Sequence, residues 1–470
     1  MAEDNKEKFE FPDLKAKYLE YYEKNQVLTV FLTGMFLMMF ICIICAIITR
    51  GTSFLGMLHS FPTYVFMDHF SMVVDSMDHP YTWHGEIYPP LGILFYGTIG
   101  HFTMPFMAGT YASTWDLACA MRDTSMPMMV FLVFILAVVM SFYILYQKFT
   151  EKDFTHNEFN AIFIALLFSY PVLFGLSTGN YIFLCVLFCV LYLYLYDSEN
   201  KWVRYFAYIC LGCAAGLKVT PAFLAVLTLK RKGWIELIKC VIIVTLLLIG
   251  PFIFTDGNPL TYFQNTLNYA STVPSTFGFL NIADIMNALG MGIWSLVLIE
   301  VIVLVVFMIL ILFDKEMERW EEATLLGAML MLIFSVSVSY TYIYMVLGLV
   351  LLLTSHKFLE NKGMWLVVIC FVAVLADYPG FWVGQNYVGS IKLVFLGIMV
   401  LYLLIMSIRR VVGSFKTGTF KPTALFKREP KEKSTKRQSK PLKKQDDKKK
   451  PVKKKNDQSN RKSKPKKTRS

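Results

Sequence analysis

The sequence predicts an all-α, polytopic membrane protein. Hydrophobic residues make up 56% of the 470 residues, and the mean hydropathy is +0.50. A soluble domain has about 45–50% apolar residues, so the excess indicates a lipid environment. Apolar runs recur along the chain, and backbone inside lipid must bond internally, which favours helices.

The first apolar run, residues 27–49, contains no charged residue. At about 1.5 Å per residue it is long enough to cross the roughly 30 Å hydrocarbon layer. It is too long for the core of a signal peptide, and no small-residue cleavage site follows it. We therefore expect it to be a retained first helix.

Later apolar runs predict further helices, several of them shorter than the about 20 residues of a straight span. Breaks at Gly and Pro are tolerated where protein or a water-filled cavity surrounds the backbone. We expect about 10 to 13 transmembrane segments in all. The predicted helices after the first lie near residues 88–111, 126–147, 159–175, 180–196, 204–217, 219–230, 235–255, 291–313, 323–337, 339–355, 363–376 and 391–408.

Positive charge is concentrated at the C-terminal end of the chain. Residues 409–470 hold 25 Lys and Arg against 5 Asp and Glu, so the formal net charge of +12 comes entirely from them. Cytoplasmic segments are enriched in Lys and Arg. We therefore expect this tail and residues 1–26, which contain five lysines, to be cytoplasmic. The loop of residues 50–87 has one Arg and no Lys, so we expect it to face outward.

The tail is of low complexity and almost free of apolar residues, which predicts a disordered polybasic segment. Such a run can bind nucleic acid. A basic segment beside a membrane is instead attracted to anionic lipid, by about 1 kcal/mol per cation near the surface. We expect anionic lipid as the partner of the tail, and no nucleic acid.

The nine cysteines form no disulfide framework in the sequence. Pairs such as Cys185 and Cys189 lie one helical turn apart in apolar runs, where cysteine acts as a small hydrophobe. No cofactor is expected, and a divalent cation is left open. A metal site of His69, Asp75 and His79 is one alternative, although their spacing matches no known ligand pattern.

The outward loop, residues 50–87, is where we expect the chemistry. It contains four of the seven histidines and several carboxylates, including Asp68, Asp75 and Glu86. Long loops without a regular pattern are usually functional or disordered. The many aromatic residues argue against disorder and indicate an amphipathic piece packed along the membrane surface. A solvated loop of ordinary polar residues is the alternative.

Asp68 and the stretch HPYTWHGEIYPPLG at residues 79–92 resemble the signature of glycosyltransferase family 87. Three further stretches follow in the order of that family: STGNY at 177–181, DSENKWVR at 197–204 and AAGLKVTPAFL at 214–224. The resemblance covers roughly residues 60–235. It implies a GT-C-type helical bundle in residues 27–408, and the activity of a mannosyltransferase that uses a polyprenyl-phosphate sugar.

Asp68 is the candidate catalytic base. Transfer with inversion passes through an oxocarbenium-like transition state and requires one carboxylate on the side of the acceptor hydroxyl. Asp68 lies in the outward loop near the membrane plane, where the head group of a lipid donor is expected. A structural carboxylate is the alternative for Asp68, and Asp75 and Glu86 are the next candidates for the base.

Lys218 is the candidate ligand of the donor phosphate. It is the only charged residue in the stretch 205–229. A cation at such depth is expensive and almost always faces a cavity or a partner. Pro221 indicates a break here between two short helices. The ammonium group would meet the phosphate as a point charge, and an ion-paired structural lysine is the alternative.

Five more residues are candidates for the substrate cavity: Glu86, Tyr88, Asn180, Tyr340 and Tyr344. Each has an alternative role. Asn180 can cap a helix, and Tyr88 stands before two prolines that open a helix. The two later tyrosines belong to the polar run SVSVSYTYIY at 335–344, which can bind sugar hydroxyls or join helices. The family usually carries a His-bearing Ser-Pro stretch about here, so its absence leaves the sugar and the acceptor open.

Residues 256–287 are expected to form a second outer loop. Its polar and aromatic side chains are candidate contacts for the acceptor: Tyr262, Asn265, Asn268, Tyr269 and Ser275.

The expected function is transfer of a hexose, with inversion, from a polyprenyl-phosphate sugar donor to a lipid-linked or cell-envelope glycan acceptor. The reaction would take place on the outer face of a cell membrane, in a bacterial protein. No Gly-rich phosphate loop or soluble domain for a nucleotide sugar is visible. A lipid-linked glycan transporter or flippase would show inverted repeats, which we do not find. A polysaccharide polymerase would have a large central outer loop.

Overall fold

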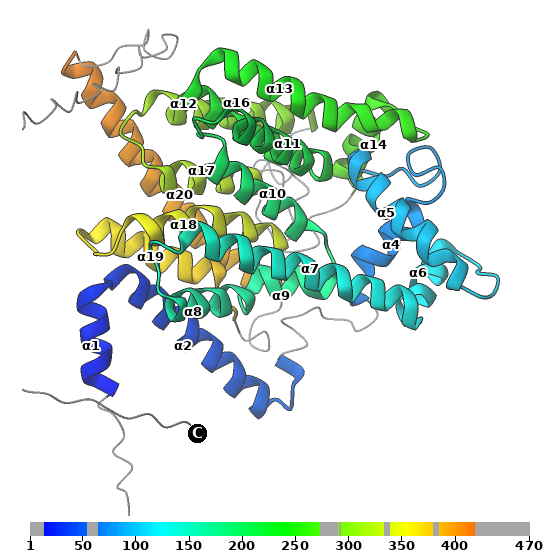
Figure 1. Ribbon diagram of the computed structural model, residues 1–470, viewed down its shortest axis with the longest axis horizontal. Helices are drawn as coiled ribbons and strands as arrows, with labels where there is room; N and C mark the ends of the chain where they lie inside the picture. Colours follow the sequence, from blue (N-terminus) through cyan, green and yellow to red (C-terminus); the bar gives the residue numbers. More distant parts are fainter. Residues whose placement is uncertain are drawn as a thin grey trace, which may run out of the picture. The chain divides into compact units, whose positions relative to one another are not determined.

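The computed structural model describes residues 14–53, 64–272, 290, 293–332, 339–378 and 385–418. These residues belong to one compact unit, Met1–Arg428. Every regular element in this part of the chain is a helix (Figure 1), which confirms the predicted all-α class.

Four helices are long and apolar enough to cross a membrane within the described residues. They are α2 (Gln26–Ile48), α7 (Ser125–Thr150), α13 with the following 3₁₀ turn η4 (Trp234–Phe254), and the part of α20 at Ile391–Lys416. The pair α8 (His156–Leu167) and α9 (Tyr170–Thr178) passes the same test together but bends by 55°. The chain is therefore a polytopic helical membrane protein.

Most of the remaining apolar helices are shorter, or are interrupted, as the sequence indicates, whereas α16 has 21 residues. They are α5 (Pro90–Thr103) with η2 (Met104–Phe106), α10 (Ile182–Leu195), α11 (Lys201–Leu217), η3 (Thr220–Ala225) with α12 (Val226–Lys232), α16 (Ile293–Phe313), α17 (Arg319–Leu332), η5 (Ser339–Tyr344) with α18 (Met345–Ser355), and α19 (Lys362–Leu375).

Proline sets several of the breaks. Pro171, Pro221 and Pro251 each lie in the first positions of a new helix or 3₁₀ turn. In the interior of a helix, proline removes a hydrogen bond and clashes with the preceding turn. It is tolerated at a helix start, where the N–H has no partner in the helix. The predicted helix 159–175 is therefore two helices, and 219–230 is a 3₁₀ turn followed by a short helix.

Four helices have no counterpart among the predicted spans. They are α1 (Leu14–Lys24), α4 (Met67–Asp75), α6 (Thr114–Asp123) and α14 (Pro259–Thr272). All four are short and carry polar residues, so hydropathy does not reveal them. Helix α4 is the amphipathic piece expected in the outward loop. Residues 409–416, which were predicted to belong to the tail, are the end of α20, and residues 419–470 lie outside the described part of the chain.

The helices pack as a bundle. Helices α10, α11 and α13 lie side by side, and α17 packs against α18. Helix α4 packs against α5 and α6 (Figure 1). Small residues allow close approach of the backbones in such packing. A Cβ on Gly327 of α17 would lie 2.8 Å from the Tyr344 carbonyl oxygen.

Ion pairs join α12, α17 and α20 away from the site region. Arg410 lies 2.9 Å from a carboxylate oxygen of Asp314 and 2.9 Å from one of Glu321. Lys230 lies 2.7 Å from the buried carboxylate of Glu322. Both basic residues satisfy carboxylates that would be costly to bury alone, so these pairs hold the helix ends together.

Candidate functional site

Asp68 lies in the first turn of α4, where the N-terminal end of a helix favours an anion. The chain enters this helix through Phe66, whose φ of 62° is left-handed. The Phe66 N–H donates to the Ser177 carbonyl at 2.7 Å. Gly179, with a φ of 77°, lets the chain pass close by, since a Cβ there would lie 3.2 Å from the Phe66 Cα. The start of α4 is thereby fixed against the connection between α9 and α10.

Asn180 connects Asp68 to the start of α10. Its side-chain amide donates to Asp68 Oδ2 at 3.1 Å, and its Oδ1 accepts from the Ile182 N–H at 3.0 Å. The side chain is buried, so a lost partner would be costly. Asn180 therefore joins the candidate base to the backbone at the start of α10, and its predicted role in the substrate cavity stays a prediction.

Lys218 stands where α11 ends. Leu217 is the last helical residue, and Lys218 has extended backbone angles of φ −140° and ψ 127°. The predicted break is thus confirmed. Its Nζ donates to the Tyr340 hydroxyl at 3.3 Å and lies 4.6 Å from the centre of that ring. The Lys218 ammonium and the Asp68 carboxylate also interact electrostatically. We call these two residues, together with Asn180, Tyr88 and Tyr340, the Asp68 cluster.

Tyr88 interacts with both charged candidates. Its ring centre is 6.0 Å from Lys218 Nζ, and its hydroxyl hydrogen-bonds Asn180. Burial, and after it the carboxylates of Asp68 and Glu86, raise the pKa of the Tyr88 phenol. Tyr88 therefore keeps its proton and can donate a hydrogen bond to a substrate.

Glu86 has a different environment from Asp68. Burial, reinforced by the nearby Asp75, raises the pKa of Glu86 to about 8. Burial also raises the pKa of Asp75, although His84 Nδ1 lies 3.6 Å from its carboxylate. Glu86 is therefore largely protonated near neutral pH and suits hydrogen-bond donation, whereas Asp68 has an amide donor and a cation beside it.

The stretch of residues 79–89 is held by Asp256, which follows η4. Its carboxylate accepts from the Tyr81 N–H at 3.1 Å and from the Thr82 N–H at 2.9 Å, and also from the Thr82 hydroxyl. Although burial opposes ionisation, these hydrogen bonds lower the pKa of Asp256. The buried Tyr81 hydroxyl donates to the Tyr88 carbonyl at 2.8 Å, which closes the loop on itself.

Helix α14, in the predicted second outer loop, supplies a second support. The Asn265 amide donates to the carbonyl oxygens of Tyr81 at 3.0 Å and Glu86 at 3.3 Å, and Tyr262 packs edge-on against Tyr81. Asn265 and Tyr262, which we expected to contact the acceptor, thus support the loop. Burial and then the carboxylates of Asp68 and Glu86 raise the pKa of Tyr269, so this predicted contact lies at the cluster. Asn268 is on the same helix, and Ser275 lies outside the described residues.

The two later tyrosines are both buried but have different partners. Tyr340 contacts Lys218 directly. The Tyr344 hydroxyl lies 3.5 Å from Cys185 Sγ. Residues 335–338 of the same polar run lie outside the described part of the chain.

The alternative metal site of His69, Asp75 and His79 is wrong. The His69 ring lies 4.6 Å from that of Phe131, and burial lowers the pKa of His69 to about 3. His79 instead packs on Trp83, with 4.1 Å between ring centres. No three His, Cys, Asp or Glu side chains are grouped to hold a metal ion anywhere in the described ranges.

Two residues of this region were missed in the sequence. Tyr181 donates to the Leu217 carbonyl at 2.5 Å and packs 5.5 Å from the Tyr88 ring, so it fixes the chain just before Lys218. Asp256 was not predicted as a site residue, because it lies 174 residues from Thr82 in the loop that it holds. The only available signal for Tyr181 was its place beside Asn180 at the start of an apolar run.

Comparison with known proteins identifies the family. The profile of "Glycosyltransferase family 87" matches residues 87–336, which is more than half of the chain. The matched range includes Tyr88, Asn180 and Lys218, and it begins after Asp68 and Glu86. No curated protein and no solved structure matches the chain. The helical bundle and the profile agree, and the chain belongs to glycosyltransferase family 87, as a membrane glycosyltransferase that takes a sugar donor and a glycan acceptor.

Proposed function

We propose that the protein transfers a hexose, with inversion and in the manner of a mannosyltransferase, from a polyprenyl-phosphate sugar. The acceptor is a lipid-linked or cell-envelope glycan on the outer face of a bacterial cell membrane. Asp68 is the catalytic base, and Lys218 binds the donor phosphate. The sugar and the acceptor are surrounded by Glu86, Tyr88, Asn180, Tyr340 and Tyr344.

The convergence of Asp68 and Lys218 carries this proposal. The two residues are 150 positions apart in the chain, yet Lys218 lies 6.0 Å from the Tyr88 ring centre, and Asp68 interacts electrostatically with both Tyr88 and Lys218. Both side chains are partly exposed, whereas Asn180 and Tyr340 beside them are buried. A carboxylate and a cation held accessible on a buried wall are the two charges that transfer from a lipid phosphate requires.

The proposed reaction uses the two charges at opposite ends of the reacting bonds. Asp68 accepts the proton of the acceptor hydroxyl as its oxygen bonds to the anomeric carbon. The bond from that carbon to the phosphate oxygen breaks, and the polyprenyl phosphate leaves with the bonding electrons. Lys218 neutralises the negative charge that accumulates on the phosphate. No proton donor to the leaving group is required.

The proposed orientation puts both termini in the cytoplasm and the Asp68 cluster outside. It is supported by the segregation of Lys and Arg, because the outward loop of residues 50–87 contains no Lys. Lipid-phosphate donors would then present their sugar to Asp68 from the outer leaflet. The basic tail would lie along anionic lipid on the other side.

The test is to incubate membranes that contain the full-length protein with radiolabelled polyprenyl-phosphate mannose, polyprenyl-phosphate glucose or a nucleotide sugar. We expect label to move from a lipid-phosphate donor into an extractable glycan or glycolipid, with mannose favoured. Membranes with Asp68→Asn are the control. Transfer from the nucleotide sugar alone would overturn the proposed donor. Movement of an intact lipid-linked glycan across the membrane without bond formation would favour the transporter alternative.

A further inference from the structure

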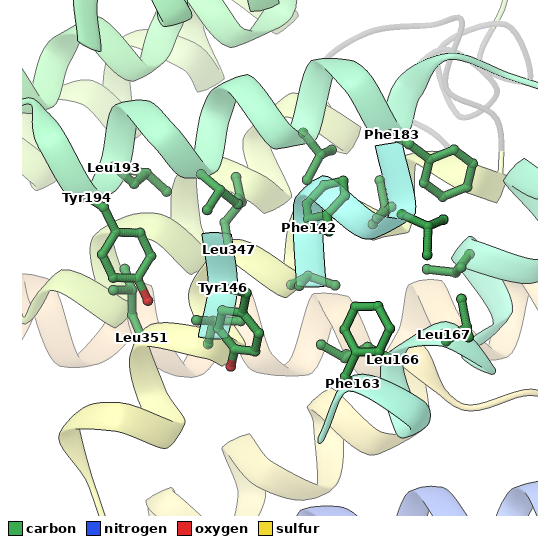
Figure 2. Close-up of a pocket in the computed structure, with 17 residues that line it drawn as sticks. Phe142, Tyr146, Phe163, Leu166, Leu167, Phe183, Leu193, Tyr194, Leu347 and Leu351 are labelled. Carbon is green, nitrogen blue, oxygen red and sulfur yellow. The ribbon is translucent and has the colours of Figure 1, made fainter. Parts of the chain in front are cut away.

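Helix α10 has two different faces. One face carries apolar side chains, among them Phe183 and Leu193, toward a groove shared with α7, α8 and α18 (Figure 2). Tyr181, which directly precedes α10, is in line with Cys185 and Tyr192 on another face, as the helical period requires. Each of these three side chains donates a hydrogen bond to a backbone carbonyl oxygen of α11 or η3. This second face therefore holds the end of α11 against α10.

The Tyr181 hydroxyl satisfies a carbonyl that α11 leaves without a donor. In a continued helix the Leu217 carbonyl would accept from the N–H of residue 221, but that residue is Pro221, which has none. Leu217 is buried, and an unpaired carbonyl there would be costly. The Tyr181 hydroxyl, which is also buried, donates to it at 2.5 Å. Tyr181 thereby fixes the place where α11 ends.

Lys218 takes its position from this anchored carbonyl. It directly follows Leu217, and its extended backbone leaves the helix at that point. From there its Nζ reaches the Tyr340 hydroxyl at 3.3 Å, and the side chain stays partly exposed. A lysine side chain is flexible, so the place of the ammonium group depends on where the backbone leaves α11. A shift of the Leu217 carbonyl would therefore move the ammonium group.

Asn180, the residue before Tyr181, makes the corresponding contact with the candidate base. Its side-chain amide donates to Asp68 Oδ2 at 3.1 Å, and its backbone N–H donates to the Gly175 carbonyl at 3.0 Å. Tyr88 contacts both residues, since its hydroxyl hydrogen-bonds Asn180 and its ring centre lies 5.5 Å from that of Tyr181. Two adjacent, buried residues thus each hold one of the two charges of the site.

We propose that Tyr181 is a positioning residue of the transfer reaction, and that Asn180 and Tyr181 together set the spacing between Asp68 and Lys218. This role rests on the proposed function, in which Lys218 binds the donor phosphate. Tyr181 is fully buried and contacts neither sugar nor phosphate, so it acts through the Leu217 carbonyl. Inversion puts the acceptor hydroxyl and the leaving phosphate on opposite sides of the anomeric carbon, which requires the base and the cation at a fixed separation.

The experiment measures two quantities on the purified full-length protein. They are the dissociation constant of radiolabelled polyprenyl phosphate and the single-turnover rate of transfer with the sugar donor saturating. Tyr181→Phe keeps the ring and removes only the hydroxyl. We expect its dissociation constant to rise roughly three- to tenfold, as for the loss of one hydrogen bond. Its saturated rate should fall as well, because the phosphate is held less well against the base.

Asn180→Ala should behave differently from Tyr181→Phe. Its saturated rate should fall, while its affinity for polyprenyl phosphate stays within a few-fold of the wild type, because Asn180 holds the base. Tyr192→Phe is the matched control, since it removes another buried hydroxyl of α10, which donates to the Leu224 carbonyl at 3.0 Å. This control should bind polyprenyl phosphate like the wild type. Each variant is first checked for an unchanged helical spectrum and a single species on gel filtration.

The double variant Tyr181→Phe/Lys218→Ala separates positioning from general damage to the fold. If the hydroxyl acts through the Lys218 ammonium, its removal should weaken binding no further once the ammonium is gone. In the Asn180→Ala background, Tyr181→Phe should keep its full effect on binding, because the two residues hold different groups.

Two results would contradict the positioning role and leave the proposed function intact. One is binding by Tyr181→Phe that matches the wild type although Lys218→Ala binds more weakly. The other is an equal loss of affinity from Tyr181→Phe with and without the Lys218 side chain. Wild-type affinity in Lys218→Ala would instead remove the phosphate role of Lys218, and the positioning role with it.

Discussion

Asp68 and Glu86 show how two carboxylates of one loop acquire different properties. Asp68 accepts a hydrogen bond from Asn180 and lies near the Lys218 ammonium. Glu86 is half-buried near Asp75, and its desolvation, reinforced by Asp75, raises its pKa to about 8. The sequence indicated both residues as candidates, but it could not separate their roles, because the groups that distinguish them come from α9–α11 and from the far end of α4.

The raised pKa of Glu86 predicts a loss of stability with rising pH. The folded protein holds this proton more tightly than the unfolded chain, whose carboxyl titrates near the ordinary value of 4.5. The contribution of neutral Glu86 is thus complete below about pH 4.5 and is lost as the pH rises through about 8. Glu86→Gln cannot lose a proton. We therefore expect that, as the pH rises from 5 to 9, the thermal midpoint of the wild type falls more than that of Glu86→Gln.

Asp78→Asn is the control for Glu86, because Asp78 is an exposed carboxylate of the same loop. The thermal midpoint of Asp78→Asn should depend on pH in nearly the same way as that of the wild type. Parallel profiles of the wild type and Glu86→Gln between pH 5 and pH 9 would show that Glu86 is ionised throughout.

Lys218→Ala should weaken donor binding. Hydrogen bonds between charged groups contribute about 1.5–3 kcal/mol, which corresponds to roughly ten- to a hundredfold in the dissociation constant. Binding of a radiolabelled polyprenyl phosphate to the purified protein measures this directly. Lys201→Ala, at an exposed lysine at the start of α11, should bind like the wild type. An unchanged affinity in Lys218→Ala would remove the phosphate role.

At the scale of elements, hydropathy and proline were sufficient to locate most helices and their breaks. The break at Lys218 followed from a cation in an apolar run and from Pro221. Contacts between distant segments could not be found in this way. The hydrogen bonds from residues 81 and 82 to Asp256 join positions that no local pattern relates, and the short polar helix α6 carries no span-like signal.

Asp256 is predicted to hold the loop that presents Glu86 and Tyr88. Asp256→Ala leaves the N–H groups of Tyr81 and Thr82 without their acceptor, at an expected cost of about 1–3 kcal/mol in unfolding free energy. Hydrogen exchange of residues 80–88 should accelerate, and transfer should slow because the loop is less well positioned. Asp123→Ala, whose exposed carboxylate pairs with the adjacent Arg122, is the control. Equal exchange in both variants would show that the loop is held by other contacts.

At the scale of the molecule, charge separates the two ends of the bundle. The Asp68 cluster and its loop lack lysine apart from Lys218, whereas Lys230 and Arg410 hold carboxylates near the predicted cytoplasmic ends. Composition and the positions of Lys and Arg were therefore enough to predict the fold class and an orientation. The number of transmembrane segments could not be predicted in this way, because several apolar helices are too short for a straight span.

The proposed orientation predicts the accessibility of introduced cysteines. Asp78→Cys lies in the loop beside the site, and Lys201→Cys lies at the start of α11. In intact cells an impermeant maleimide should label the first variant and should label the second only after the membrane is permeabilised. The wild type, with its nine native cysteines, gives the background. Labelling of the second variant alone in intact cells would reverse the orientation.

The most direct test of the proposed mechanism is single-turnover transfer by Asp68→Asn with the donor already bound. Loss of a general base costs about 10²- to 10⁴-fold in rate. We therefore expect the rate of transfer by Asp68→Asn to fall by at least that order, while its donor affinity stays within a few-fold of the wild type. Asp75→Asn should remain far more active than Asp68→Asn. Undiminished transfer by a correctly folded Asp68→Asn would contradict the assignment of Asp68 as the base.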